Sequence, residues 1–506
     1  MISALPRSRA LSAAILILAG CLVGCVSVPA DRGRSEVDAW VRERTRAADD
    51  AARESLAPET VAERVRDLLS RPLTPGISVR LALLGNPDLH ATYARLDLAV
   101  ADAYEAGRLA NPRFSAAILD SNVAGEQLTL GVVLRFVDLL FLPSRARIGA
   151  ARFAQAKQDV THEVLQLTAR AEESHYRLVA AQQLAAMREL ASVAAGASAA
   201  LAQRFHAAGN ITGLERAREE AAASQARLET LAAQAELAEA RARHARLLGL
   251  SAATHWSVEE NLGAPLATEA DVESLTALAQ SSRLDLAAAR SRTESLASLA
   301  GQTRRTHAIA DLEVGVERER ETDGERLTGP MIGFAVPVFG TGSDRSLRAT
   351  AELERSRAAL AGLELDVVHE VKLAHARTLN AKGRAEEFRS VLVPAREAIV
   401  ARMQEEYNFM LAGQFELLAA KQAEYAAYSG YIESVRDYWL ARTELARAVG
   451  TRLPDTPDGA IAPIAVPRPA EGRPDDEHRH HGTTGNDGTA GNDRTTGNDV
   501  ATGGAP

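Results

Sequence analysis

Cysteine and aromatic residues are scarce in this sequence. Its 506 residues include 2 cysteines, and the aromatic share is 4%. Both cysteines, Cys21 and Cys25, lie near the N-terminus, so the rest of the chain has no thiol for a disulfide or for redox chemistry. Alanine, leucine and valine therefore carry most of the 46% hydrophobic content. This composition favours long helices packed at short distance over one thick core.

An excess of positive charge is also missing. The net charge is −9 and the pI is about 5.8. This mild acidity argues against nucleic acid as a partner. The sequence contains no nucleophile triad, phosphate-binding loop or metal-ligand spacing. We therefore expect neither an enzyme nor a bound cofactor.

Residues 1–20 have the pattern of a bacterial lipoprotein signal peptide. Arg7 and Arg9 lead into an apolar stretch of about 11 residues, which is too short to span a bilayer. The LAGC motif that ends at Cys21 follows, with small residues for the signal peptidase and a thiol to receive the lipid. Cys25, at the end of LVGC, is the alternative acceptor, and a plain secretory signal is a further alternative. Neither cysteine precedes aspartate, which favours the outer membrane, and no transmembrane helix is predicted.

The remaining chain divides into a lead-in, two similar units and a tail. Residues 21–75 form a polar lead-in, residues 76–250 and 251–453 form the units, and residues 454–506 form a tail rich in Gly, Asn, Asp and Thr. Such a tail cannot bury a core and is expected to be disordered. The only close group of histidines in the sequence lies there: His478, His480 and His481. Weak binding of copper or zinc and a simply solvated tail are both open, so we predict no confident metal site.

The two units repeat the same order of elements about 200 residues apart. Asp88-Leu89 returns as Asp285-Leu286, and the run that ends at Gly249 returns as the run that ends at Gly450. Each unit reads as a helix, two strands, a very long helix, a tight break and another long helix. The predicted helices span 78–109, 144–206, 212–248, 271–305, 343–411 and 414–449. The fold class is therefore mainly α with a small β part and an internal twofold repeat.

The strands alternate between an apolar and a polar face. One apolar face contains Leu128, Leu130, Val132, Leu134 and Phe136, and a later strand alternates Leu312, Val314 and Val316 with acidic residues. Strands of about 9–11 residues with this pattern are typical of outer-membrane β-barrels. Four strands cannot close a barrel, and lipid does not tolerate an open edge, so several chains must contribute strands. The alternative is two exposed hairpins on a soluble helical protein.

An outward apolar face would turn a row of carboxylates toward the lumen of such a barrel. The acidic residues of this strand are Asp311, Glu313, Glu317 and Glu319. They would give the exit an acidic wall.

The sequence resembles the TolC-like outer-membrane efflux proteins, in particular the outer-membrane factor lipoproteins of resistance–nodulation–division type efflux systems. The resemblance covers about residues 75–453 and rests on the order, spacing and duplication of several short motifs. In the first unit these are NPDL at 86–89, AGR at 106–108, NPRF at 111–114 and FVDLL at 136–140. In the second they are RLDL at 283–286, VPVF at 336–339 and the run 407–450.

The resemblance implies a homotrimer in the outer membrane. Long α-helical hairpins would form a periplasmic α-barrel, and four β-strands per chain would contribute to a trimeric 12-stranded outer-membrane β-barrel. It implies a passive exit duct, loaded by an inner-membrane pump through a periplasmic adaptor protein, that carries heavy-metal ions or drugs. The chain would be lipid-anchored and extend into the periplasm. A type I protein secretion duct and a structural coiled-coil envelope lipoprotein are the alternatives.

The resemblance also places the periplasmic, adaptor-binding tip at the two helix breaks. Mapped onto this sequence, the tip consists of Gly209, Asn210, Ile211, Thr212 and Gly213, followed by Ala412, Gly413, Gln414 and Phe415. Helix capping without a partner is the alternative. Three carboxylates near the second break would form an acidic gate in a trimer if they face inward, or a solvated face if they do not: Glu405, Glu406 and Glu416.

The spacing between the repeats varies along the chain. It is 197 residues between Asp88 and Asp285, 204 between Gly209 and Gly413, and 201 between Gly249 and Gly450. The variation places extra residues at 408–411. We therefore predict that the second break is the inward, gating one.

Overall fold

The computed structural model describes residues 30–45, 58–121, 125–306, 312–334, 343–454 and 464–467. The chain divides into residues 1–467 and residues 468–506, and all described residues belong to the first unit. The lead-in contains α2 (Arg34–Arg44) and α3 (Pro58–Leu69). The first repeat contains α4 (Pro75–Gly85), α5 (Asp88–Ala106), β1 (Arg113–Ser121), β2 (Gly125–Arg135), α6 (Phe136–Ala207) and α7 (Gly213–Leu248). The second contains α8 (Val272–Ser282), α9 (Leu284–Thr306), β3 (Leu312–Arg320), β4 (Arg326–Phe334), α10 (Ser343–Glu387), the π-helix η2 (Phe388–Leu392), α11 (Val393–Asn408) and α12 (Gln414–Val449).

The first helix of each repeat is broken, which corrects the prediction of single helices over 78–109 and 271–305. Asn86, with ψ 121°, separates α4 from α5 because the residue before Pro87 is forced out of the helical region. Its side chain donates a hydrogen bond to the Leu247 carbonyl at 2.8 Å. Arg283, with ψ 122°, separates α8 from α9, and its guanidinium donates to the Ala448 carbonyl at 3.2 Å. Each break thus anchors the end of a long helix.

The helix α6 begins at Phe136, eight residues earlier than predicted, and takes over the end of the expected second strand. The ladder between β2 and β3 ends at the pair Arg135 and Glu313, so no strand partner holds Phe136. With 72 residues, α6 is about 108 Å long. The tight break after α6 and the strand before it therefore lie at opposite ends of this helix.

The four strands form one antiparallel sheet in the order β1-β2-β3-β4. One row of paired residues joins Phe114, Val132, Val316 and Pro330, and these apolar side chains lie on one face of the sheet. On that face Phe114 is 75% exposed and Ile332 is 67% exposed. The predicted apolar face is therefore present and uncovered in the single chain. The motif VPVF at 336–339 lies outside the described part of the chain.

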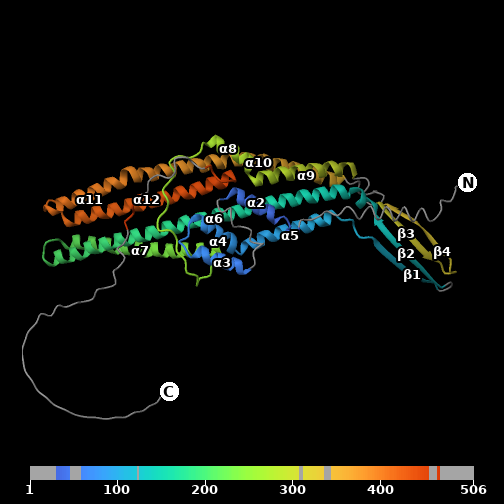
Figure 1. Ribbon diagram of the computed structural model, residues 1–506, viewed down its shortest axis with the longest axis horizontal. Helices are drawn as coiled ribbons and strands as arrows, with labels where there is room; N and C mark the ends of the chain where they lie inside the picture. Colours follow the sequence, from blue (N-terminus) through green and yellow to red (C-terminus); the bar gives the residue numbers. More distant parts are fainter. Residues whose placement is uncertain are drawn as a thin grey trace, which may run out of the picture. The chain divides into compact units, whose positions relative to one another are not determined.

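The long helices pack as pairs, α6 with α7 and α11 with α12 (Figure 1). Buried residues of α6 have counterparts 200 residues later in α10: Leu167, Ala171, Leu178, Ala181 and Ala185 match Val367, Val371, Thr378, Ala381 and Ala385. The helices α7 and α12 each have 36 residues, and each is followed by a C-cap glycine in the left-handed region, Gly249 and Gly450. The two halves thus share their packing pattern.

The second long hairpin contains one residue more than the first, and a π-turn accommodates this residue. The breaks have equal length and equal hydrogen bonds, since Asn210 N–H donates to Phe205 C=O and Leu411 N–H donates to Glu406 C=O, both at 2.8 Å. The spacing there is 201 residues, not 204, so the predicted extra residues at 408–411 were wrong. The additional residue lies in η2, because a π-turn absorbs one residue within an α-helix. The predicted helix 343–411 is divided there.

A buried polar network joins α4, α6 and α7. The Ser78 hydroxyl lies 3.1 Å from His175 Nδ1 and 3.3 Å from His244 Nε2, and His244 Nδ1 lies 3.1 Å from the Ser174 hydroxyl. Ser78 and His244 are fully buried. Burial, together with the neighbouring His175, lowers the pKa of His244 to about 3. Both imidazoles therefore link helices as hydrogen-bonding groups.

Candidate functional site

The first helix break is a short loop with a capped exit. Gly209 adopts φ 77°, which glycine reaches without a steric cost, and the chain then reverses into α7. Thr212 caps α7 because its hydroxyl accepts the Glu215 N–H at 3.2 Å and its own N–H donates to the Glu215 carboxylate at 2.7 Å. Hydrogen bonds from the Thr212 backbone N–H and hydroxyl to the Glu215 carboxylate lower the pKa of Glu215. Of the predicted tip residues, Asn210 and Ile211 lie in the loop with Gly209, and Gly213 begins α7.

The second helix break has the same geometry but a different surface. Met410 takes the left-handed φ of 60° in the place that Gly209 occupies in the first break. Phe409, Met410 and Leu411 are exposed by 76%, 93% and 78%. The sequence did not indicate this apolar triad, because Gly413 is the glycine that matches Gly209 by residue type. The spacing of 201 residues at Gly450 was the signal that would have found it.

Of the residues predicted at the second break, Ala412 and Gly413 lie in the loop, and Gln414 and Phe415 begin α12. Gly413 N–H donates to the Glu416 carboxylate at 2.9 Å. The Phe415 ring packs edge-on against Phe205, with centroids 5.9 Å apart. The structure therefore brings the two breaks together, and Phe415 joins them instead of projecting from the tip.

The three carboxylates near the second break have different surroundings. Glu416 is held by the backbone N–H of Gly413 and serves as a helix cap. Glu405 and Glu406 are exposed, and within the described ranges neither forms an ion pair. All three carboxylates are exposed, and Glu405 and Glu406 do not cap a helix.

The polar face of the sheet gathers the predicted acidic residues of β3. Glu313 lies 3.9 Å from the Arg113 guanidinium, and Glu319 accepts a hydrogen bond from Gln127. Glu317 lies in the row of Gly131 on the same face, opposite to the apolar residues. Asp311 lies outside the described residues. Neighbouring side chains thus partly compensate the negative charge of these carboxylates.

The turn between β3 and β4 gathers further carboxylates that the sequence analysis did not single out. One carboxylate oxygen from each of Glu321, Asp323 and Glu325 lies within 4.8 Å of the others. The predicted lipidation residues Cys21 and Cys25 and the tail histidines His478, His480 and His481 lie outside the described part of the chain.

One described helix has the length and apolar content to cross a membrane. The stretch Phe141–Ala207 of α6 has an 18-residue window with a mean hydropathy of 1.2, although the sequence analysis predicted no such helix. It meets this test by length and composition only. The helix packs against α4, α5, α7, α9 and α12, and 28% of that window is buried.

The fold is that of solved outer-membrane channels. The outer-membrane channel OprN aligns with a TM-score of 0.62 and 20% identity, over 81% of this chain and 96% of OprN. The outer-membrane protein VceC from Vibrio cholerae aligns with a TM-score of 0.60 and 16% identity, over 77% of this chain and 96% of VceC. CusC, which forms a transmembrane channel, aligns with a TM-score of 0.61 and 14% identity, over 77% of this chain and 92% of CusC. No family model and no curated protein matches the chain.

Proposed function

We propose that the chain is the outer-membrane exit duct of a tripartite efflux system. The observation that carries this proposal is the sheet, whose exposed apolar face is joined directly to helices long enough for a periplasmic tube. Each of β1 and β4 has one strand partner, so two edges of the described sheet are free. Lipid does not tolerate free edges, and pairing with two further copies closes a barrel of twelve strands. The functional unit is therefore a homotrimer.

The two sequence units have matching roles in this assembly. In the units 76–250 and 251–453, the hairpins α6–α7 and α10–α12 build the wall of the periplasmic tube. The lead-in 21–75 follows a lipid anchor at Cys21, or alternatively Cys25, and the chain resides in the outer membrane. Energy comes from an inner-membrane pump, since a passive duct needs none of its own.

The helix breaks contact the periplasmic adaptor protein. Exposed apolar side chains on a loop favour a protein partner, and Phe409, Met410 and Leu411 form such a group at the second break. The exposed carboxylates Glu405 and Glu406 repeat threefold in a trimer and favour the passage of cations where they face inward. We propose heavy-metal ions or drugs as the transported substrates, with the second break as the gate.

Cysteine cross-linking tests the trimer. In a Cys25→Ser background, Ala117→Cys on β1 combined with Leu327→Cys on β4 should yield covalent trimers with a short bismaleimide reagent. The matched control is Ala117→Cys with Thr129→Cys, which are partners in one ladder and should cross-link within one chain. Monomers alone from the first pair, with the control cross-linked, would contradict the duct and favour an envelope scaffold.

A further inference from the structure

The apolar face of the sheet becomes basic toward the turn between β3 and β4. Side chains alternate between the two faces of a strand, so every second residue of β3 lies on this face. Val316 is its last apolar residue on β3, and Arg318 and Arg320 follow. Arg326 of β4 is the ladder partner of Arg320 and therefore lies on the same face. All three arginines are exposed.

The register of the sheet brings these arginines together, and we call Arg318, Arg320 and Arg326 the arginine cluster. Arg320 and Arg326 are directly opposite each other, which places their Cβ atoms about 5 Å apart. Arg318 lies about 7 Å from Arg320 along the same strand. Like charges directly opposite each other destabilise a ladder. An anion held between the guanidiniums would remove this repulsion.

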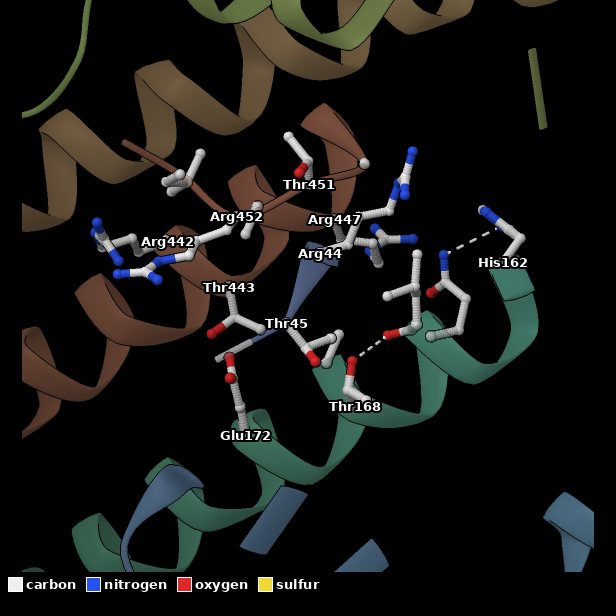
Figure 2. A pocket seen from close by; sticks show the side chains of 16 residues that line it. Arg44, Thr45, His162, Thr168, Glu172, Arg442, Thr443, Arg447, Thr451 and Arg452 are labelled. Atoms are coloured by element: carbon white, nitrogen blue, oxygen red, sulfur yellow. Dashed lines mark hydrogen bonds between the residues drawn. The ribbon is translucent and has the colours of Figure 1, made fainter. Parts of the chain in front are cut away.

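The arginine cluster lacks the carboxylate partners that other arginines of the chain have. Arg44 lines a cavity between α2, α6 and α12 (Figure 2) and lies 2.8 Å from Glu43. Arg447 lines the same cavity and lies 3.8 Å from Glu444. Among the residues that the structure describes, no carboxylate forms an ion pair with the arginine cluster. Its guanidiniums are therefore open to an anion from outside the chain.

The carboxylates at this end of the sheet lie closer to the turns. Asp120 and Glu126 pair with each other at the end of the ladder between β1 and β2, on the same face as the arginine cluster. Three carboxylates of the turn between β3 and β4 lie within 4.8 Å of one another: Glu321, Asp323 and Glu325. The basic charge is thus confined to the border between the apolar face and the turns.

The arginine cluster lies at the end of the sheet that is far from the helices. The helix α6 begins directly after Arg135, whose ladder partner Glu313 is at the other end of β3. Arg318 and Arg320 follow Leu312, the first residue of β3, by about 20 and 27 Å along the strand. In the proposed barrel the helices extend into the periplasm, so the arginine cluster points toward the outer leaflet.

This position corresponds to the level of the lipid headgroups. The apolar band of outer-membrane barrels is about 25 Å tall, and their strands are tilted by about 40°, so the arginine cluster lies near the outer border of the band. Arginine on a lipid-facing surface is costly at the bilayer centre and tolerated near the interface, where its long side chain reaches the headgroups.

We propose that the arginine cluster binds the phosphate of a lipid headgroup in the outer leaflet, with one such lipid on each chain. Guanidinium forks match the oxygens of phosphate and bind them more strongly than neutral donors do. Leu130 and Val316 border the cluster on the same face and supply an apolar surface for the acyl chains. The inference rests on the proposed function, because it requires this face of the sheet to contact lipid.

Native mass spectrometry of the full-length trimer in detergent tests this site. The probes are phosphatidate and diacylglycerol with identical acyl chains, which differ only by the phosphate. The wild-type trimer should retain one phosphatidate per chain and bind it at least about tenfold more tightly than diacylglycerol. The double variant Arg318→Gln with Arg320→Gln should lose this preference. Both residues lie on β3, which has a strand partner on each side, so the free edges of β1 and β4 stay unchanged.

Two control variants make the result specific. Arg113→Gln removes an exposed arginine from the opposite face of the same sheet and should keep the preference for phosphatidate. Arg318→Lys combined with Arg320→Lys should keep part of it, because lysine retains the charge but not the fork. Equal retention of phosphatidate and diacylglycerol by the wild type, or an unchanged preference in the double glutamine variant, would overturn the assignment.

The yield of trimers separates this inference from the proposed function. Trimers that form normally but show no preference for phosphatidate would refute the lipid site and leave the duct intact. A wild-type chain that gives no trimers in the membrane fraction would refute both.

Discussion

At the scale of single residues, the buried pair His175 and His244 ties three helices together. Ser78 lies between the two rings, within 3.3 Å of a nitrogen of each. In one consistent proton arrangement, His244 Nε2–H donates to Ser78, whose hydroxyl donates to His175 Nδ1. That leaves His175 Nε2–H directed at Glu259, 3.8 Å away. In the same arrangement, Nδ1 of the neutral His244 accepts the Ser174 hydroxyl at 3.1 Å.

The first prediction concerns acid stability. An unfolded histidine binds a proton near pH 6.5, whereas the pKa of native His244 is about 3. The unfolded state therefore binds more protons between these values, and stability falls as the pH drops through this window. Urea unfolding should show a loss of about 2–3 kcal/mol from this group between pH 7.5 and 4.5. His244→Gln should lose less stability over that range, and the exposed His255→Gln should behave like the wild type. An unchanged pH slope in His244→Gln would refute the assignment.

At the scale of elements, the π-helix η2 explains how the second hairpin holds one more residue than the first. Pro394 lies two residues after the end of η2, and a proline ring clashes with the carbonyl four residues earlier in a regular helix, which here belongs to Ser390 of η2. The wider π-turn relieves this clash. Phe388, at the start of η2, lies against Gly430 of α12, where an added Cβ would meet its ring at 2.5 Å. The insertion is thus accommodated in the middle of the hairpin, and the two breaks keep the same backbone.

The second prediction distinguishes the backbone strain at Met410 from the proposed contact of its side chain with the adaptor protein. Met410 occupies a left-handed conformation that costs a non-glycine residue about 1–2 kcal/mol, and it is 93% exposed. Met410→Gly should therefore leave thermal stability equal or raised, yet lower efflux in cells because an apolar contact to the adaptor is lost. Met410→Asn, which also tolerates this conformation, should act in the same way. Gly209→Asn at the first break is the matched control and should retain efflux. Full efflux in both Met410 variants would contradict an adaptor contact at this residue.

At the scale of the whole molecule, the two faces of the sheet have different surroundings in the proposed trimer. The apolar face contacts lipid, and the polar face lines the lumen. Ile332 lies on the apolar face of β4, next to Met331 on the polar face. The third prediction is that Ile332→Arg prevents stable insertion, since arginine on a lipid face costs about 2–4 kcal/mol near the bilayer centre. Met331→Arg should be tolerated because it points into the lumen. Heat-resistant trimers in outer-membrane fractions provide the measurement, and equal trimer yields would argue against the proposed orientation.

Local sequence patterns were sufficient to predict the type and the order of most helices and strands. Periodicity located the long helices, alternation located the strands, and Gly249 and Gly450 marked helix ends because glycine adopts left-handed angles freely. The candidate tip was only partly predictable. By residue type, Gly413 is the match for Gly209. In the structure, the left-handed conformation of Gly209 is instead repeated at Met410, and methionine rarely adopts it.

The sequence by itself determined that the chain has long alanine-rich helices, two-faced strands and two similar halves, because each property depends on residues close together in the chain. Only the tertiary structure decided where α4 and α8 end and where the extra residue of the second hairpin lies. The physical reason is that these features depend on contacts between distant segments. Asn86 reaches Leu247, Arg283 reaches Ala448, and Phe388 packs against Gly430.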